Sequence, residues 1–299
     1  MRAESRAGHS NSKQNFPAYA TRGPDVCFVV SQPVLRAILQ PIWRAFRPLV
    51  PFDTAVSIVR EVLSDQGFGC GGSIATSGEL GVFELLAGSD SPVLFDVGGH
   101  VGYYAAAFVR SFPNGRAFVF EPSAAHFSRL LEHVGGRRNV TLLQKALGAA
   151  SGKATLYKDA EVTGLASLTR SRLGHFGIEM DKEEQVQVST LDEARAENSI
   201  DFIDLLKIDV EGSELDVLSG ATLAFDQGAI GAVQFEFGGC NLDTRTNLKD
   251  FFCFFADRRY RLHIVKPTGA IHPLQGYDEM YEQYRTTNYV ALPHVRNSE

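Results

Sequence analysis

The sequence predicts an α/β protein with a doubly wound, mostly parallel seven-stranded sheet and an antiparallel strand at its C-terminal edge. Two observations predict this class. From residue 92 onward, short apolar segments alternate with amphipathic helical segments, which is typical of parallel strands joined by crossover helices. The last two strand-like segments, 260–265 and 288–292, have no helix between them, which favours an antiparallel pair.

Each element follows from a local pattern of apolar residues. Strands are indicated by short apolar or β-branched runs, and helices by apolar residues three or four positions apart. The expected strands are 93–96, 117–121, 140–143, 205–210, 232–236, 260–265 and 288–292. The expected helices are 103–112, 124–134, 214–223 and 248–257. Two accessory strands, 154–157 and 186–188, are expected around a polar insert.

The N-terminal third of the chain is organised differently. Residues 1–33 are polar and are expected to form a flexible tail. Residues 34–90 are expected to form a helical extension, which prolines such as Pro41 divide into short helices. The remaining residues, 91–299, contain the alternating strands and helices and are expected to form one α/β domain.

Composition excludes several classes of protein. The chain has 299 residues, of which 44% are hydrophobic and 21% charged, so it is neither wholly disordered, nor collagen-like, nor a coiled coil. Its net charge of −6 disfavours nucleic acid as a partner. No uncharged apolar run reaches about 18 residues, so no transmembrane segment is expected. The four cysteines form no CxxC pair, and residues 1–24 hold no signal-peptide pattern. We therefore expect reduced cysteines and a cytoplasmic location.

The first motif is a glycine turn directly after the first strand. It contains Asp96, Gly98 and Gly102, and ligands of open α/β sheets bind at such strand ends. A dinucleotide fingerprint would need glycine at position 97, where Val97 stands. A carboxylate at the strand tip suits a cationic or hydrogen-bond-donating ligand better than a pyrophosphate.

The second motif is Phe120-Glu121-Pro122, at the end of the second strand. Glu121 follows Asp96 by 25 residues, and an acidic residue at about this spacing usually binds ribose hydroxyls. Together the two motifs predict an adenosine-type nucleoside across the first two strands.

The third motif places charges on the predicted central strand. Lys207, Asp209 and Glu211 share one strand face because side chains alternate. Charges are costly in a strand buried on both faces unless they serve a site or pair with one another. Lys207 can offset either carboxylate, so an internal ion-pair network is the alternative interpretation. Glu236 ends the next strand and is a further candidate.

These motifs together resemble class I S-adenosylmethionine-dependent methyltransferases of the FkbM type. The resemblance covers about two-thirds of the chain, and its most specific element is KIDVEGSE at 207–214. The segments that carry it are FDVGGHVGYY (95–104), FVFEPS (118–123), NVTLLQKALG (139–148), VSTLDE (188–193), LLKIDVEGSELDVLSGA (205–221) and VQFEF (233–237). His100 stands where the family often has asparagine.

The resemblance implies a cofactor arrangement. The methionine end of S-adenosylmethionine would be held by Asp96 and the Gly98–Gly102 turn, and the ribose by Glu121. Ala146 would line the adenine pocket, and Asp209 would lie beside the sulfonium. The full predicted cofactor set is Asp96, Gly98, Gly99, His100, Gly102, Glu121, Pro122, Ala146 and Asp209.

The resemblance also implies methyl transfer to a hydroxyl group of a sugar or secondary metabolite, which needs a base. The candidates are Asp209, Glu211, Glu236 and, less suited by its place beside the cofactor turn, His100. Mg²⁺ could bind Asp209, Glu236 and Asn241, although nothing in the spacing requires a metal. The acceptor is expected to contact segments 158–185 and 268–287, including Thr163, His175, Tyr277, Tyr281 and Tyr284.

Two alternatives stay open at the level of sequence. An NAD-dependent oxidoreductase is disfavoured by Val97, by Asp96 at the strand tip and by the terminal antiparallel pair. A catalytically silent cofactor-binding module is disfavoured by the charged groups retained at the strand tips. The sequence does not specify the oligomeric state.

Overall fold

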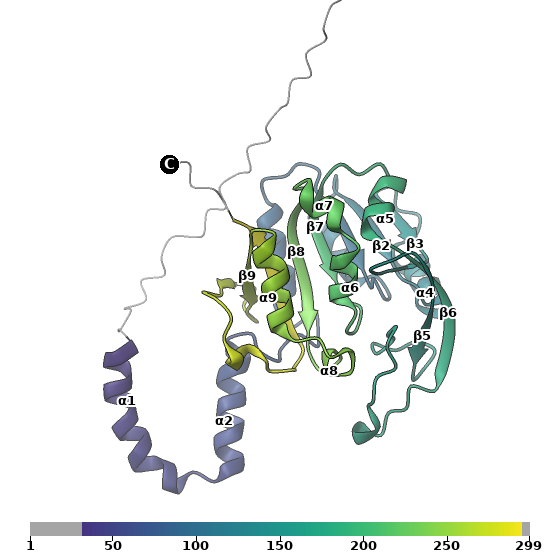
Figure 1. The fold of residues 1–299 in the computed structure, drawn as a ribbon. Helices are drawn as coiled ribbons and strands as arrows, with labels where there is room; N and C mark the ends of the chain where they lie inside the picture. The colour runs from purple at the N-terminus through teal and green to yellow at the C-terminus, as the bar shows by residue number, and fades with distance from the viewer. Residues whose placement is uncertain (1–31, 295–299) are drawn as a thin grey trace, which may run out of the picture.

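The computed structural model describes residues 32–294, and its body is a twisted sheet with helices on both faces (Figure 1). Residues 1–31 of the predicted tail lie outside the described part. The main sheet has the order β10-β9-β11-β8-β7-β1-β2-β3. Its strands are β1 Val93–Val97, β2 Arg116–Phe120, β3 Val140–Leu143, β7 Ile203–Ile208, β8 Ile230–Phe237, β9 Tyr260–Val265, β10 Ile271–Pro273 and β11 Thr287–Pro293.

The strand pairing confirms the predicted fold class. Strands β3, β2, β1, β7 and β8 pair in parallel, so their carboxyl ends meet at one edge. Strand β11 runs antiparallel to both β8 and β9. It lies inside the sheet because residues 287–291 are all buried and need partners on both sides. The edge itself is formed by β10, a short eighth strand antiparallel to β9 that the sequence did not predict.

Helices cover both faces of the sheet, as a doubly wound fold requires. One core holds Phe95, Leu206 and Phe235 beneath α5, α6, α7 and α9, and the opposite core holds Leu94 and Leu205 beneath α3 and α4. Adjacent residues of one strand thus enter opposite cores. The helices are α3 Tyr103–Ser111, α4 Ala124–Val134, α5 Leu191–Glu197, α6 Glu214–Ser219, α7 Thr222–Asp226, α8 Asn241–Thr244 and α9 Leu248–Asp257.

The prediction of one continuous helix over 214–223 is wrong, because the structure divides this segment into α6 and α7. The division falls at Gly220, where a Cβ atom would lie 2.1 Å from the carbonyl oxygen of Gly148. This close backbone approach ends α6 and begins a second short helix. No local pattern in the sequence predicts a contact between segments so far apart.

A second, three-stranded sheet covers one end of the main sheet. Its strands are β4 Ala146–Leu147, β5 Gly152–Lys158 and β6 Lys182–Ser189, in the order β4-β6-β5. Both predicted accessory strands are therefore present and longer than expected. The connection between β5 and β6 reaches back toward the carboxyl ends of the parallel strands.

The N-terminal helices are α1 Gln32–Phe46, the 3₁₀ turn η1 Arg47–Leu49 and α2 Phe52–Asp65. The prediction that Pro41 divides the first helix is wrong, because α1 continues through it; a proline removes one backbone hydrogen bond without preventing helical turns on either side. Figure 1 shows α1 and α2 standing away from the sheet. The next element, the 3₁₀ segment η2 Glu79–Leu86, packs on the sheet through Val82 and Phe83, so this part of the expected extension joins the body.

Candidate active site

The turn after β1 brings three strands together. Asp96 is 2% exposed within β1, and its Oδ2 atom has no hydrogen-bond partner. The amides of Gly98 and Gly99 both donate to the carbonyl oxygen of Phe120, at 2.9 and 3.0 Å. Gly98 has φ +85°, and a Cβ there would lie 1.8 Å from the carbonyl oxygen of Asp209. Glycine is therefore required at this position for both reasons.

Glu121 lies beside this turn and is fixed by backbone donors. Its Oε2 accepts from the His100 amide at 2.9 Å, and its Oε1 accepts from the Ser123 amide at 2.8 Å. Each carboxylate oxygen still has capacity to accept a further hydrogen bond. Glu121 is thus held in place while it retains acceptor positions for ligand hydroxyls.

His126, which the sequence analysis did not single out, supports Glu121 from α4. The side chain is 1% exposed, and its Nδ1 lies 3.5 Å from Oε1 of Glu121. Its Nε2 accepts from the amide of Thr163 at 2.9 Å. Nδ1 must therefore carry the proton in this arrangement. No spacing in the sequence distinguishes this histidine from other residues of an amphipathic helix.

Lys207 forms the centre of a charged network under the site. Its Nζ lies 2.9 Å from Oδ2 of Asp209 and 3.8 Å from Oε2 of Glu79. Burial alone would lower the pKa of Lys207, but Asp209 and Glu79 together raise it. The predicted pairing with Asp209 is present. Glu79 was missed because it comes from η2, more than a hundred residues earlier in the chain, and belongs to no motif.

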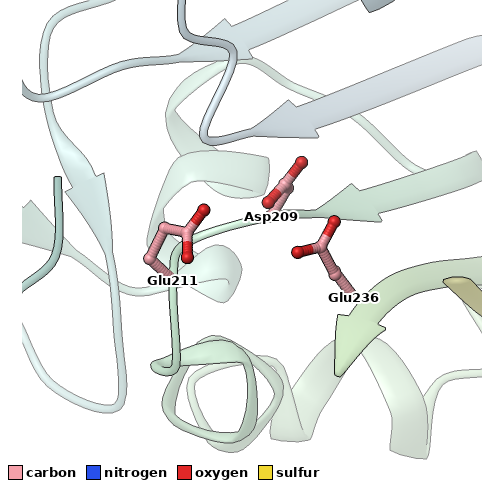
Figure 2. Close-up of side chains that lie close together, drawn as sticks. All are labelled: Asp209, Glu211 and Glu236. Carbon is pink, nitrogen blue, oxygen red and sulfur yellow. The ribbon is translucent and has the colours of Figure 1, made fainter. Parts of the chain in front are cut away.

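Three carboxylates converge beyond Lys207. Oxygen atoms of Asp209, Glu211 and Glu236 all lie within 4.8 Å of one another. Figure 2 shows them turned toward a common space between the ends of β7 and β8. Burial raises the pKa values of Glu211 and Glu236, and the neighbouring carboxylates raise them further. The three groups, which we call the carboxylate cluster, therefore favour a shared proton or a bound cation over full ionisation.

The glycine turn after β1 is also electrostatically unusual. Burial raises the pKa of Asp96 to about 7, and Lys207 only partly opposes this shift. Burial and the neighbouring His126 lower the pKa of His100, which favours its neutral form. The Nε2 atom of His100 is buried without a hydrogen-bond partner. Both side chains therefore have polar atoms that the protein itself leaves unpaired.

One cavity of about 660 Å³ joins these groups. It is lined by nearly all the predicted site residues: Asp96, Gly98, Gly99, His100, Glu121, Pro122, Ala146, Asp209, Glu211 and Glu236. Gly102 does not line it. Gly102 precedes α3 with φ +86°, and a Cβ there would lie 2.6 Å from Leu130 Cδ1, so this glycine permits helix packing.

Asn241, the third expected magnesium ligand, does not join the cluster. Its Oδ1 accepts from the Gly238 amide at 2.8 Å, and its Nδ2 donates to Glu214. Glu214 also accepts from the amides of Val210 and Gly212. The two side chains brace the loop that carries Glu211, and Glu211 takes the place that the sequence analysis gave to Asn241.

The connection between β5 and β6 closes one side of the cavity. Residues 163–168 line it, and the Ser167 hydroxyl donates to the carbonyl oxygen of Glu211 at 2.7 Å. Of the five residues expected to contact an acceptor, only Thr163 lines the cavity. The other four residues do not line it: His175, Tyr277, Tyr281 and Tyr284. The hydroxyls of Tyr277 and Tyr284 instead donate to Glu282 and Asn247.

Comparison with known families gives one decisive match. The sequence model of the Methyltransferase FkbM domain matches residues 96–262, more than half of the chain and all three motifs. The chain belongs to the FkbM methyltransferase family. The resemblance inferred from the motifs is thus confirmed.

Curated relatives of this chain include 2-O-methyltransferase NoeI of Sinorhizobium fredii, 28% identical over 148 residues, which are 46% of this chain and 60% of the relative. Methyltransferase 1 of Beauveria bassiana is 28% identical over 153 residues, which are 46% of this chain and 61% of the relative. The chain thus matches only about 60% of the length of these relatives. A solved FkbM methyltransferase from Methylobacillus flagellatus is 14% identical, with a TM-score of 0.41, over 79% of this chain and 60% of the other. No helix among residues 32–294 has the length and hydrophobicity to cross a membrane.

Proposed function

We propose that the chain transfers a methyl group from S-adenosylmethionine to a hydroxyl group of a sugar or other small metabolite. The observation that supports this most is the single cavity bounded by Asp96, Glu121 and the carboxylate cluster. Its glycine turn suits the methionine end of the cofactor, with the unpaired Oδ2 of Asp96 available to the ammonium group. Glu121 has free acceptor capacity for the ribose hydroxyls, and Ala146 would lie beside the adenine.

The carboxylate cluster lines the same cavity as Asp96 and Glu121, so it can act on an acceptor that enters this cavity. Methyl transfer is an in-line displacement, and alignment of the nucleophile can contribute about 7–11 kcal/mol. Asp209 is the member that accepts a hydrogen bond from Lys207, and it can orient an acceptor hydroxyl or accept its proton. Burial and neighbouring carboxylates raise the pKa of Glu236, so it can hold the proton that the cluster gains.

Instead of a proton, the carboxylate cluster could hold a divalent cation. Its donors are hard carboxylate oxygens, which Mg²⁺ prefers, and the residues that would hold it are Asp209, Glu211 and Glu236. Bound there, the cation would lower the pKa of a hydroxyl group that reached it. Electron paramagnetic resonance with Mn²⁺ tests this: Glu236→Gln should weaken binding, and Glu132→Gln on the exposed side of α4 should not.

The cofactor assignment is tested by calorimetric titration of the protein with S-adenosylhomocysteine and with NADH. Saturable binding of the first and none of the second is expected. The reverse result would favour an oxidoreductase. Methyl transfer from labelled S-adenosylmethionine should then be assayed over sugars and hydroxylated metabolites. Tight cofactor binding without transfer to any acceptor would favour a silent binding module.

Once an acceptor is found, Asp209→Asn should lower kcat at least about tenfold and change the Kd for S-adenosylhomocysteine much less. Its proposed roles stabilise mainly the transition state, so the loss should appear in turnover. EDTA added to the wild type separates a metal-dependent role from direct proton transfer. Normal turnover with weak cofactor binding would make Asp209 a cofactor ligand and direct the search for the base to Glu236.

A further inference from the structure

The exposed apolar side chains of the described residues concentrate on the N-terminal helices. Nine large ones, each more than half exposed, lie between residues 39 and 62: Leu39, Ile42, Trp43, Phe46, Leu49, Phe52, Ile58, Val59 and Val62. Elsewhere in residues 32–294, large apolar side chains with comparable exposure lie singly on separate elements: Tyr103, Leu131, Phe176, Leu223, Leu242 and Met280. A contiguous exposed apolar face marks a site of interaction.

The face on α1 is sharply defined. Leu39, Ile42, Trp43 and Phe46 recur three or four positions apart and therefore share one side of the helix. Arg44 lies on the other side. All described side chains of α1 are exposed, so nothing in the described part of the chain covers this face. Figure 1 shows α1 beyond α2, away from the sheet.

The charge of this segment is opposite to that of the rest of the chain. Residues 32–51, which we call the basic arm, contain Arg36, Arg44 and Arg47 and no acidic residue. The other residues therefore hold 26 of the 29 basic residues and all 35 acidic ones, a net charge of −9. A basic amphipathic helix with tryptophan on its apolar side is typical of helices that lie in the interface of an anionic membrane.

We propose that the basic arm docks the protein on an anionic lipid surface. Helix α1 lies in the plane of the interface, with Ile42, Trp43 and Phe46 among the acyl chains and with Arg44 and Arg47 at the head groups. Since α1 stands away from the acidic body, it can reach the surface while the body stays off it (Figure 1). The proposal rests on residues outside the cavity and is independent of the proposed function.

A second copy of the chain fits the arm less well. Two α1 helices packed through their apolar faces would leave the arginines of both without an acidic partner, because the basic arm contains no acidic residue. Outside the basic arm and α2, the described surface offers only scattered apolar side chains to receive the face. An anionic bilayer satisfies both the apolar side and the basic side of the helix at once.

The test is sedimentation of the full-length protein with vesicles of phosphatidylcholine alone or mixed with phosphatidylglycerol. Binding to the anionic vesicles only, weakened by salt, is expected. Arg44→Gln combined with Arg47→Gln should weaken it about 25-fold, since each basic residue near such a surface contributes about fivefold. Trp43→Ser combined with Phe46→Ser should abolish it.

Leu223→Ser is the matched control, because it removes a comparably exposed apolar side chain outside the arm. It should bind vesicles like the wild type. S-adenosylhomocysteine binding and thermal unfolding show that each variant is folded. No binding to anionic vesicles, or equal binding to neutral ones, would overturn the proposal. So would a wild-type dimer in analytical ultracentrifugation that Trp43→Ser with Phe46→Ser converts to monomer, without vesicle binding by either.

Discussion

Single residues in this site are held by contacts that leave selected polar atoms unpaired. Asp96 is buried with Oδ2 free, whereas Glu121 is fixed by two backbone amides and retains further acceptor capacity. A buried polar atom without a partner is costly, so its persistence indicates a ligand that satisfies it. The two carboxylates thus differ: Asp96 has a buried oxygen without a hydrogen-bond donor, whereas both oxygens of Glu121 already accept from backbone amides and can accept further hydrogen bonds.

The raised pKa of Asp96 predicts pH-dependent cofactor binding. Only the ionised carboxylate pairs fully with an ammonium group, and burial raises the pKa of Asp96 to about 7. Binding of S-adenosylhomocysteine should therefore be about tenfold weaker near pH 6 than near pH 8. Calorimetry across this range measures it, and Asp96→Asn should bind weakly with little pH dependence. A wild-type affinity that does not change over the range would contradict the assignment.

The same shift has a consequence for stability. The folded pKa lies above the usual value of 3.8, so Asp96 favours the folded state most when protonated. Its contribution to the free energy of unfolding should fall as pH rises from 3.8 to about 7. Asp96→Asn removes this contribution, and urea unfolding at both ends of the range detects its loss.

Glu121→Gln should weaken binding of S-adenosylhomocysteine by about 1.5–3 kcal/mol, because hydrogen bonds to charged groups contribute this much. The amide would also turn an NH₂ group toward one of the two backbone donors, His100 or Ser123. An analogue without the ribose hydroxyls should lose much less affinity in the variant. Equal losses for the two ligands would mean that Glu121 does not bind the ribose.

At the scale of elements, the site depends on close approach between backbones. The turn after β1 touches the residue that follows β7, since Gly98 faces the Asp209 carbonyl oxygen. The loop carrying Glu211 is braced by Glu214 and Asn241. The carboxyl ends of neighbouring parallel strands thus lie close enough for residues distant in sequence to form one site.

Gly98→Ala should lower the free energy of unfolding by about 2 kcal/mol more than Gly136→Ala. Both glycines have positive φ, but a Cβ at Gly98 would lie 1.8 Å from a carbonyl oxygen, whereas a Cβ at Gly136 would have no packing neighbour within 4 Å. The difference between the two variants isolates the steric contribution from the backbone strain that they share. Chemical unfolding measures both, and equal effects would contradict the close approach.

The whole molecule combines a packed body with an arm that contributes little to it. The packed body begins near Phe68, which joins the core, and Leu63 near the end of α2 packs against it. Helix α1 has only exposed side chains among those described. Folding and cofactor binding should therefore depend on the body, and surface docking on the arm.

Deletion of residues 1–50 tests this division. The melting temperature should change by less than about 2 °C, and the Kd for S-adenosylhomocysteine should be unchanged, because the described residues of this segment, 32–50, belong to neither core. Deletion of residues 1–70 is the comparison, since it removes Leu63 and Phe68 from the core and should lower the melting temperature clearly. A large loss of stability from the shorter deletion would show that the deleted segment contributes to the stability of the body.

The sequence by itself determined the fold class, the succession of the five parallel strands along the chain and the residues of the glycine turn after β1. These depend on local patterns: strand tips, a glycine turn and the spacing from Asp96 to Glu121. Only the tertiary structure decided that Glu79 and His126 support the site, that Glu211 rather than Asn241 completes the carboxylate cluster, and that Gly102 serves packing. It also decided that β11 lies inside the sheet. These outcomes depend on contacts between segments far apart in the chain, and no local pattern encodes which distant partner a side chain will meet.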